Sequence, residues 1–190
     1  PSICARVCDH QCEARCRLKS SGDQPLAVRA LKRFVTDRVD PAKVRPPVPP
    51  APSGARRVAV VGAGPAGLTA AHGLSLRGCR VTLFDSEAEP GGMLLTGIPP
   101  YRLPRKVIAR EIEALLDPNI EFKGKTRWGP AFTVKQLLSQ GYHAVFLAVG
   151  AHQSGKLGLE GENVEGVHSS LGFLRAFHRE GKSLARGRVG

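Results

Sequence analysis

The stretch Val58-Ala-Val-Val-Gly62-Ala-Gly64-Pro-Ala-Gly67 decides the fold. It is a G-x-G-x-x-G pattern between a short apolar run and a helical pattern, which is the context of a dinucleotide-binding loop. Gly62 permits the tight turn, Gly64 lets the backbone approach a pyrophosphate, and Gly67 lets helix and strand pack closely. The first helical turn then offers free N–H groups to phosphates. The residues predicted to hold the diphosphate are Gly62, Ala63, Gly64, Pro65, Ala66 and Gly67.

An acidic residue follows this loop at a suitable distance. Asp85 ends the next predicted strand, 23 residues after Gly62, near the ~20 at which an acid accepts ribose hydroxyls. An acid there disfavours a 2′-phosphate, and so disfavours NADP in this site. The alternative is a structural glycine turn with Asp85 as a solvated strand end. The loop alone does not distinguish FAD from NAD, because both bind to it.

The remaining sequence from Arg56 alternates strand and helix patterns, which implies a parallel sheet in an α/β domain. The long apolar run 143–149 is typical of a central parallel strand. The predicted strands are 57–61, 80–84, 120–122 and 143–149, and the predicted helices are 65–76, one that opens at Pro104 and one near 170–177.

Three regions differ in composition: residues 1–40 are Cys-rich and then basic, 41–55 carry six prolines, and 56–190 form the α/β domain. The proline-rich part is expected to be an extended, semi-rigid linker. Asp23 followed by Pro25 predicts the start of a helix. Its expected apolar face is Leu26, Leu31, Phe34 and Val35, and its expected outer residues are Arg29, Lys32 and Arg33.

Four of the five cysteines form the series Cys4-x3-Cys8-x3-Cys12-x3-Cys16. Clustered cysteines without a secretory signal favour a metal site over disulfides. A cubane cluster needs converging thiols, whereas one regular helix would line them along a side, so loops and turns are expected. Thiolates select zinc or iron–sulfur clusters, and the spacing leaves both open. Cys79, before an apolar strand, is interpreted as a buried core thiol.

The chain carries 28 Lys and Arg against 16 Asp and Glu, a net charge of +12. A basic surface suits a polyanion, an acidic partner domain or an anionic dinucleotide. With one Trp and two Tyr, the chain lacks the basic stripe with interleaved aromatics that nucleic-acid binding requires. No apolar run approaches the ~20 residues of a membrane span. We therefore expect neither a nucleic-acid nor a membrane partner, and a cytoplasmic location.

Four segments in combination resemble the glutamate synthase small-subunit family. This family includes the FAD-binding part of dihydropyrimidine dehydrogenase and subunits of NAD(P)-linked formate dehydrogenases and hydrogenases. The resemblance runs over essentially the whole chain. It is carried by Gly62–Gly67, Pro90–Met93, Gly97–Pro104 and Tyr142–Ala151.

The resemblance implies that the dinucleotide is FAD. It implies a parallel Rossmann-like FAD-binding domain, incomplete in this chain, behind a small helical iron–sulfur segment. Gly62–Ala66 would then hold the FAD pyrophosphate and Asp85 the adenosine ribose. A surface salt bridge is the alternative for Arg102, and plain packing for Met93. The further cofactor contacts implied by the family are Gly91, Gly92, Met93, Arg102, Arg127 and Gly150.

The segment from Cys4 to Cys16 is similar to the family's 4Fe-4S segment. A single cluster held by Cys4, Cys8, Cys12 and Cys16 is the favoured arrangement. In the two-cluster arrangement of the family, Cys8 and Cys12 serve one cluster and Cys16 serves the other. A Gln ligand of some relatives aligns with Lys32, which as a cation does not ligate.

The resemblance also implies a function. The chain is expected to be a piece of an NAD(P)H-dependent flavoprotein oxidoreductase, truncated before a second domain that binds NAD(P)H. Electrons would pass from NAD(P)H to FAD and then singly through the cluster to a larger partner, such as a glutamate synthase large subunit. No general acid, base or nucleophile is expected, because the cofactors carry the chemistry. The alternative is a dinucleotide-binding or regulatory module with a structural zinc site and no turnover.

Overall fold

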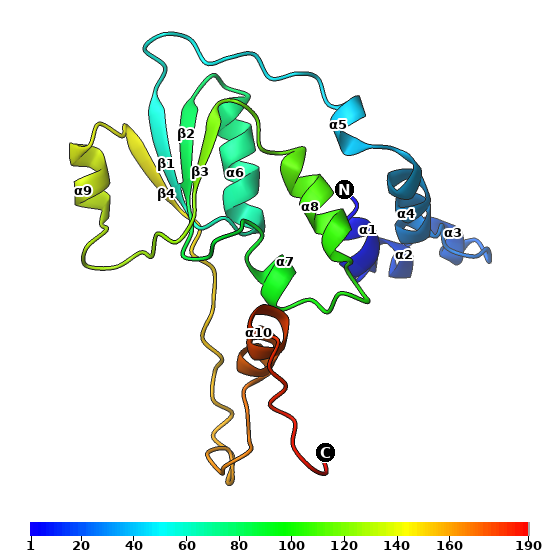
Figure 1. The fold of residues 1–190 in the computed structure, drawn as a ribbon. Helices are drawn as coiled ribbons and strands as arrows, with labels where there is room; N and C mark the ends of the chain where they lie inside the picture. The colour runs from blue at the N-terminus through cyan, green and yellow to red at the C-terminus, as the bar shows by residue number, and fades with distance from the viewer. Residues whose placement is uncertain (190) are drawn as a thin grey trace.

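A computed structural model describes residues 1–189. It contains one parallel sheet with helices on both faces and a group of short helices at the N-terminus (Figure 1). In chain order the elements are α1 (Cys4–Val7), α2 (Gln11–Ala14), α3 (Arg17–Ser20), α4 (Val28–Arg38), α5 (Pro41–Val44), β1 (Arg57–Val61), α6 (Pro65–Ser75), β2 (Arg80–Phe84), α7 (Met93–Thr96), α8 (Arg105–Glu113), β3 (Ile120–Lys123), α9 (Val134–Ser139), β4 (Ala144–Leu147) and α10 (Ser170–Glu180).

The sheet has the order β3-β2-β1-β4, and all three strand pairs are parallel. Val58 in β1 is in register with Val81 in β2 and Ala144 in β4. The carboxyl ends of the strands therefore meet at one edge of the sheet, where open α/β sheets bind their ligands. The predicted α/β fold with a parallel sheet is confirmed.

The position of β4 differs from the sequence prediction. The apolar run was expected to form a central strand, but β4 pairs only with β1 and lies at the edge of the sheet. Phe146 and Leu147 are 44% and 51% exposed, and no strand among residues 1–189 pairs with the outer edge of β4. A run that is apolar on both faces predicts a strand, but it does not place that strand in the sheet.

Helices cover the two faces of the sheet unequally. Helices α6 and α8 lie on one face, where residues such as Val60, Leu83 and Ile108 are almost completely buried (Figure 1). Each such side chain contributes ~1.5–3 kcal/mol to stability. On the other face α9 places Leu137 in a smaller cluster with Phe84. Among residues 1–189, no helix is long and apolar enough to cross a membrane.

Local sequence explains the helices that bound the sheet. Pro65 opens α6 at its first position, where the missing N–H costs nothing. Thr133 and Gln136 form a capping box at the start of α9, with each side chain bonded to the other's backbone N–H. Sequence reasoning missed α9, although its Thr-x-x-Gln signature is present.

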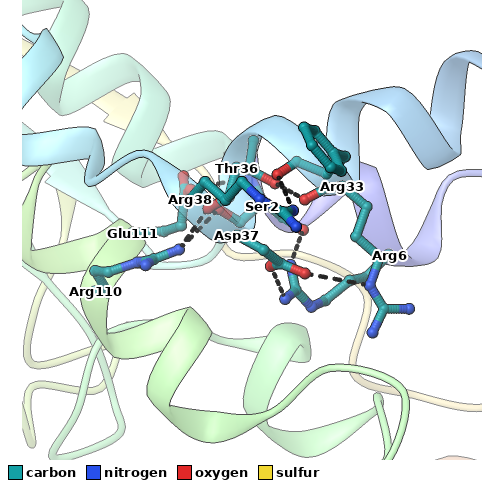
Figure 2. Close-up of polar contacts among 9 residues, drawn as sticks. Ser2, Arg6, Arg33, Thr36, Asp37, Arg38, Arg110 and Glu111 are labelled. Atoms are coloured by element: carbon teal, nitrogen blue, oxygen red, sulfur yellow. Dashed lines mark hydrogen bonds and ion pairs between the residues drawn. The ribbon is translucent and has the colours of Figure 1, made fainter.

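The N-terminal segment packs directly on α8 (Figure 2). The backbone N–H of Ser2 donates to Glu111 Oε1 at 2.9 Å, and Arg110 donates to the carbonyl oxygen of Thr36 at 3.0 Å. Arg6 forms an ion pair with Asp37, and its hydrogen bond holds the pKa of that carboxyl below its usual value. Ile3 and Val7 also pack against the main core. The segment and the sheet domain therefore share one interior.

Helix α4 differs from its prediction in start and in orientation. It begins at Val28, not after Asp23, because the Glu13 carboxylate of α2 accepts the Arg29 N–H at 2.8 Å and caps the helix from a distance. Arg29, expected outside, turns inward and donates to the carbonyl oxygen of Cys8 at 3.1 Å. All four residues of the expected apolar face are more than half exposed: Leu26, Leu31, Phe34 and Val35.

The proline-rich stretch is only partly extended. Asp40 caps the short helix α5, which the prediction of an extended linker missed. The stretch is then fixed to the domain, because Arg45 donates to the carbonyl oxygen of Ala114 at 2.9 Å. Asn119 accepts from Ala51 N at 2.7 Å and donates to the carbonyl oxygen of Pro49 at 3.0 Å. The division of the chain at residues 40 and 55 stays a prediction.

Candidate functional site

Two glycines of the loop between β1 and α6 admit no side chain. Gly62 has φ +107°, and a Cβ added to it would lie 2.1 Å from the carbonyl oxygen of Ala148. A Cβ on Gly67 would lie 1.7 Å from the carbonyl oxygen of Gly62. Both residues are thus required by the packing of the chain itself, as the loop pattern predicts.

Gly64 differs, because a Cβ there would meet nothing within 4 Å. It is the N-cap of α6 and supplies no side-chain cap, and the next two residues, Pro65 and Ala66, are exposed. The first turn of α6 therefore presents its backbone toward open space, with the positive end of the helix dipole. The residues present fit a phosphate group at this position.

The Gly91-Gly92 pair lies against the same loop. Gly91 N donates to the carbonyl oxygen of Ala63 at 2.8 Å, and Gly91 and Gly92 have φ of +137° and +52°. A Cβ on Gly92 would lie 2.9 Å from the Cα of Gly64. The structure thus places the Gly91-Gly92 pair in contact with the glycine loop, whereas the sequence showed only that one follows the other along the chain. Met93, the next residue, accepts a hydrogen bond from Thr96 through its sulfur at 3.4 Å.

Asp85 lies at the carboxyl end of β2 and contacts the glycine loop. Its Oδ2 accepts the Ala63 N–H at 2.6 Å, and its Oδ1 accepts the Glu87 N–H at 2.8 Å. A carboxylate has about four acceptor positions, so each oxygen retains capacity for a hydroxyl group. Asp85 therefore both shapes the loop and faces the space beside it.

A pocket of about 200 Å³ opens beside Asp85 and Gly62. Arg127, predicted from the family resemblance, lines it, so the structure brings these predicted residues together. Sequence reasoning missed its other wall residues. Ser86, Thr126 and Val149 lie within three residues after the ends of β2, β3 and β4, and this position is the signal that would have found them. The missed residues are Val61, Ser86, Thr126, Trp128, Val149, His152 and Arg175.

Of the predicted contacts, Gly62, Asp85 and Arg127 line this pocket, whereas Met93, Arg102 and Gly150 lie outside both the pocket and the glycine loop. Arg102 is exposed in a turn in which its N–H donates to the carbonyl oxygen of Pro99 at 3.0 Å. Gly150 follows β4 with φ +72°, so a side chain would be strained there. Their roles toward a cofactor stay predictions.

The four N-terminal cysteines lie on a series of short helical turns, in keeping with the expectation that no single helix carries them. Cys4 begins α1, Cys8 is the C-cap that follows it, Cys12 lies in α2 and Cys16 precedes α3. Cys4 and Cys12 are exposed, whereas Cys8 and Cys16 are half-buried. Among residues 1–189, no three His, Cys, Asp or Glu side chains converge as metal ligands do. The favoured single-cluster arrangement has no preformed geometry here, and the ligand set stays a prediction.

The half-buried thiols nevertheless have the chemistry of thiolate ligands. Backbone hydrogen bonds from Leu26 and Leu18 lower the pKa of the Cys16 thiol. Cys8 Sγ accepts the His10 N–H at 3.4 Å. Hydrogen bonds of this kind stabilise sulfur that carries negative charge, whether it is free or bound to metal. Because its potential ligands are cysteine thiolates, the segment fits either an iron–sulfur cluster or a zinc ion.

A larger cavity, of about 680 Å³, lies away from the glycine loop between α8 and α10. Burial, and then the neighbouring Arg105, lower the pKa of His178 at its wall. Its walls include Leu95, Ile108 and Ile112, which also belong to the core around α8. The candidate site is the smaller pocket, because it adjoins the cradle, which is the backbone of Gly62–Gly67 together with Gly91 and Gly92.

Two family models match separate parts of the chain. A model described as dihydropyrimidine dehydrogenase domain II, 4Fe-4S cluster, matches residues 1–44. A model of an NAD(P)-binding Rossmann-like domain matches residues 60–106. The first covers all four clustered cysteines, and the second covers the glycine loop, Asp85 and the Gly91-Gly92 pair.

Relatives of known identity cover nearly the whole chain. The beta subunit of an NADPH-Fe(3+) oxidoreductase from Geobacter sulfurreducens is 41% identical over 165 residues, which are 86% of this chain and 24% of the relative. The small chain of the NADPH glutamate synthase of Escherichia coli K12 is 38% identical over 178 residues, 93% of this chain and 37% of the relative. The chain thus spans less than two fifths of the length of these relatives.

A solved structure shares the fold at lower identity. FprA of Mycobacterium tuberculosis in complex with NADPH aligns with a TM-score of 0.59 and 26% identity, over 64% of this chain and 28% of that one. Fold and cradle together define a Rossmann-like dinucleotide-binding protein with a Cys-rich segment of the 4Fe-4S type. The chain belongs to the family of the glutamate synthase small subunit, whose members include NADPH-dependent oxidoreductase subunits.

Proposed function

We propose that this chain is the FAD-binding and iron–sulfur portion of an NAD(P)H-dependent oxidoreductase. The observation that carries the proposal is the backbone cradle at Gly64, left open by its own chain and closed on one side by Gly92. Two relatives have NADPH-linked names and are subunits, which supports the redox setting. FAD supplies hydride acceptance and one-electron release, and a 4Fe-4S cluster supplies one-electron transfer.

The residues of this chain would bind and orient these groups. Backbone N–H groups at the start of α6 would hold the FAD diphosphate, with Gly91 and Gly92 beside it. Asp85 would accept the hydroxyls of the adenosine ribose, and Arg127 would contact the same end of the cofactor. Met93, Arg102 and Gly150 are proposed to lie along its remaining length. Cys4, Cys8, Cys12 and Cys16 would hold the cluster as thiolates.

A partner is part of the same proposal. The relatives are named as beta or small subunits, which supports a larger subunit as the electron acceptor. The apolar edge strand β4, with Phe146 and Leu147 exposed, supports further protein packed on the sheet. NAD(P)H would bind a second domain, as in the family resemblance. Clustered thiols that must stay reduced suit the cytoplasm.

The decisive experiment is anaerobic purification followed by absorbance spectroscopy and analysis of iron, sulfide, zinc and flavin. We expect flavin absorbance near one FAD per chain together with iron and sulfide. A protein that binds neither FAD nor FAD analogues after reconstitution would overturn the proposal. Flavin reduction by NAD(P)H requires the longer protein and is tested there.

A second candidate function is a dinucleotide-binding or regulatory module with a structural zinc site. The observation that favours it is the separation of the four thiols, of which no three converge among residues 1–189. Tightly bound zinc and no iron after anaerobic preparation would support it. That result would remove the electron relay and leave the FAD site unchanged.

A further inference from the structure

The adenosine end of the proposed FAD site contains an arginine that no loop motif provides. Arg175, from α10, lines the same pocket as Asp85 and Arg127. Its guanidinium is paired with Glu87, with Nη2 2.5 Å from Oε1. Helix α10 thus reaches the carboxyl edge of the sheet from a position 88 residues further along the chain.

Glu87 occupies a central position between the pocket and α10. Its backbone N–H donates to Asp85 Oδ1 at 2.8 Å, and its carbonyl oxygen accepts the Lys125 N–H at 3.0 Å. Its side chain points to α10, where Oε2 also lies 4.0 Å from Nε of Arg179. The Glu87 backbone therefore orients the ribose acid, while its carboxylate neutralises a cation of the pocket wall.

The charges of Arg175 and Glu87 bear on whether the pocket accepts an adenosine with a 2′-phosphate or one with a free 2′-hydroxyl. A free guanidinium beside the ribose is the group that accommodates a 2′-phosphate in NADP sites. Arg175 is 49% exposed and lines this pocket, but its charge is matched by Glu87. Asp85 and Arg127, which carry opposite formal charges, also line this pocket. With Glu87 counted against Arg175, the formal charges of Asp85, Glu87, Arg127 and Arg175 sum to zero, which disfavours a phosphate dianion in the pocket.

We propose that Glu87 is a specificity-determining residue: it holds Arg175 away from a 2′-phosphate, so that the pocket selects an adenosine with a free 2′-hydroxyl. This inference rests on the proposed FAD function and extends it. It assigns α10, outside the glycine-loop unit, a part in the choice of cofactor. Because Asp85 is oriented by the backbone of Glu87, changing the side chain leaves the ribose acid in place.

The test compares binding of ADP-ribose and 2′-phospho-ADP-ribose by titration calorimetry to flavin-free protein. In Glu87→Gln the ratio of the two affinities should shift by about tenfold toward the 2′-phosphate form, because one charge-assisted contact becomes available. Adding Arg175→Gln to this variant should restore the original ratio. Circular dichroism verifies that each variant is folded.

Glu89→Gln is the matched control. It removes the same charge two residues along the loop, where Glu89 pairs with Arg179 at 3.6 Å and does not line the pocket. The ratio should stay near that of the unaltered chain. An unchanged ratio in Glu87→Gln, or an equal shift in Glu89→Gln, would overturn the role of Glu87 while leaving FAD binding intact. Failure of the unaltered chain to bind either ligand would overturn the FAD proposal as well.

Discussion

The glycine cradle and the cysteine segment are both proposed cofactor sites, but they are built in different ways. The cradle consists of backbone, and its shape follows from contacts such as that between Gly67 and Gly62, which leave no freedom. The cysteine segment consists of side chains on short helices, and no three of its thiols converge among residues 1–189. A backbone site is therefore formed when the sheet folds. A thiolate site gains much of its order only from its metal.

The largest expected effect tests the rigidity of the cradle. In Gly67→Ala the added methyl would lie 1.7 Å from the carbonyl oxygen of Gly62, so α6 must move. We expect a loss of about 3 kcal/mol in unfolding free energy and loss of FAD binding, measured by urea denaturation and flavin titration. Gly73→Ala in the same helix is the control. There the new Cβ meets only Arg77 Nη1 at 3.6 Å, so stability should rise by ~0.5–1 kcal/mol.

The second test concerns the cysteine segment and asks whether Cys16 is a ligand of the proposed cluster. Cys16→Ser removes the thiol whose pKa the backbones of Leu26 and Leu18 lower, and we expect the reconstituted protein to lose most of its iron. Cys79→Ser should keep its iron, because Cys79 packs against the main core. Iron and sulfide analysis after anaerobic reconstitution measures both variants. Equal iron in the two proteins would exclude Cys16 as a ligand.

The third test concerns the junction between the two regions (Figure 2). Burial alone would raise the pKa of Glu111, but the N-terminal amine and hydrogen bonds from Ser2 lower it below its ordinary value of 4.5. The stability that Glu111 contributes is therefore complete above that value and is lost as the pH falls through the depressed pKa of the folded state. Glu111→Gln should cost roughly 1–2 kcal/mol at pH 7.

The measurement for Glu111→Gln is thermal unfolding between pH 3 and pH 7. The two proteins should converge at the acid end of this range, where the carboxyl of the unaltered chain is protonated. Glu113→Gln, an exposed neighbour on α8, is the control and should follow the unaltered curve. A constant difference at all pH values would show that the charge of Glu111 contributes nothing.

The smallest expected effect concerns the exposed arginine of the Tyr-Arg-Leu-Pro motif. Arg102→Gln should weaken FAD binding by about fivefold, or about 1 kcal/mol, because the contact is made near solvent. Unfolding free energy should stay the same, since Arg102 is exposed. Flavin fluorescence titration measures the affinity, with Lys106→Gln, at an exposed position in α8, as control. Identical affinities in both variants would make Arg102 a residue without a cofactor role.

Much of the cradle was predictable, because its geometry depends on residues that are close together in the sequence. The spacing of Gly62, Gly64 and Gly67 and the strand before them predict the loop, and the structure has it. Asp85 could be placed because it directly follows a strand, whereas Arg127 was predicted only from the family resemblance. Helix α4 was predicted less well, since its N-terminus is capped by Glu13 from another helix and its Arg29 turns inward. No pattern within α4 carries that information.

The sequence by itself determined the four strands, the parallel sheet and the glycine loop. These depend on backbone dihedrals and on periodicities of two and 3.6 residues, which neighbouring residues specify. Only the tertiary structure decided that β4 lies at the edge, that Gly92 closes on Gly64, and that Arg175 meets Glu87 beside the pocket. Such contacts join segments far apart in the chain, and they form only when the packing of the whole sheet fixes where each loop ends.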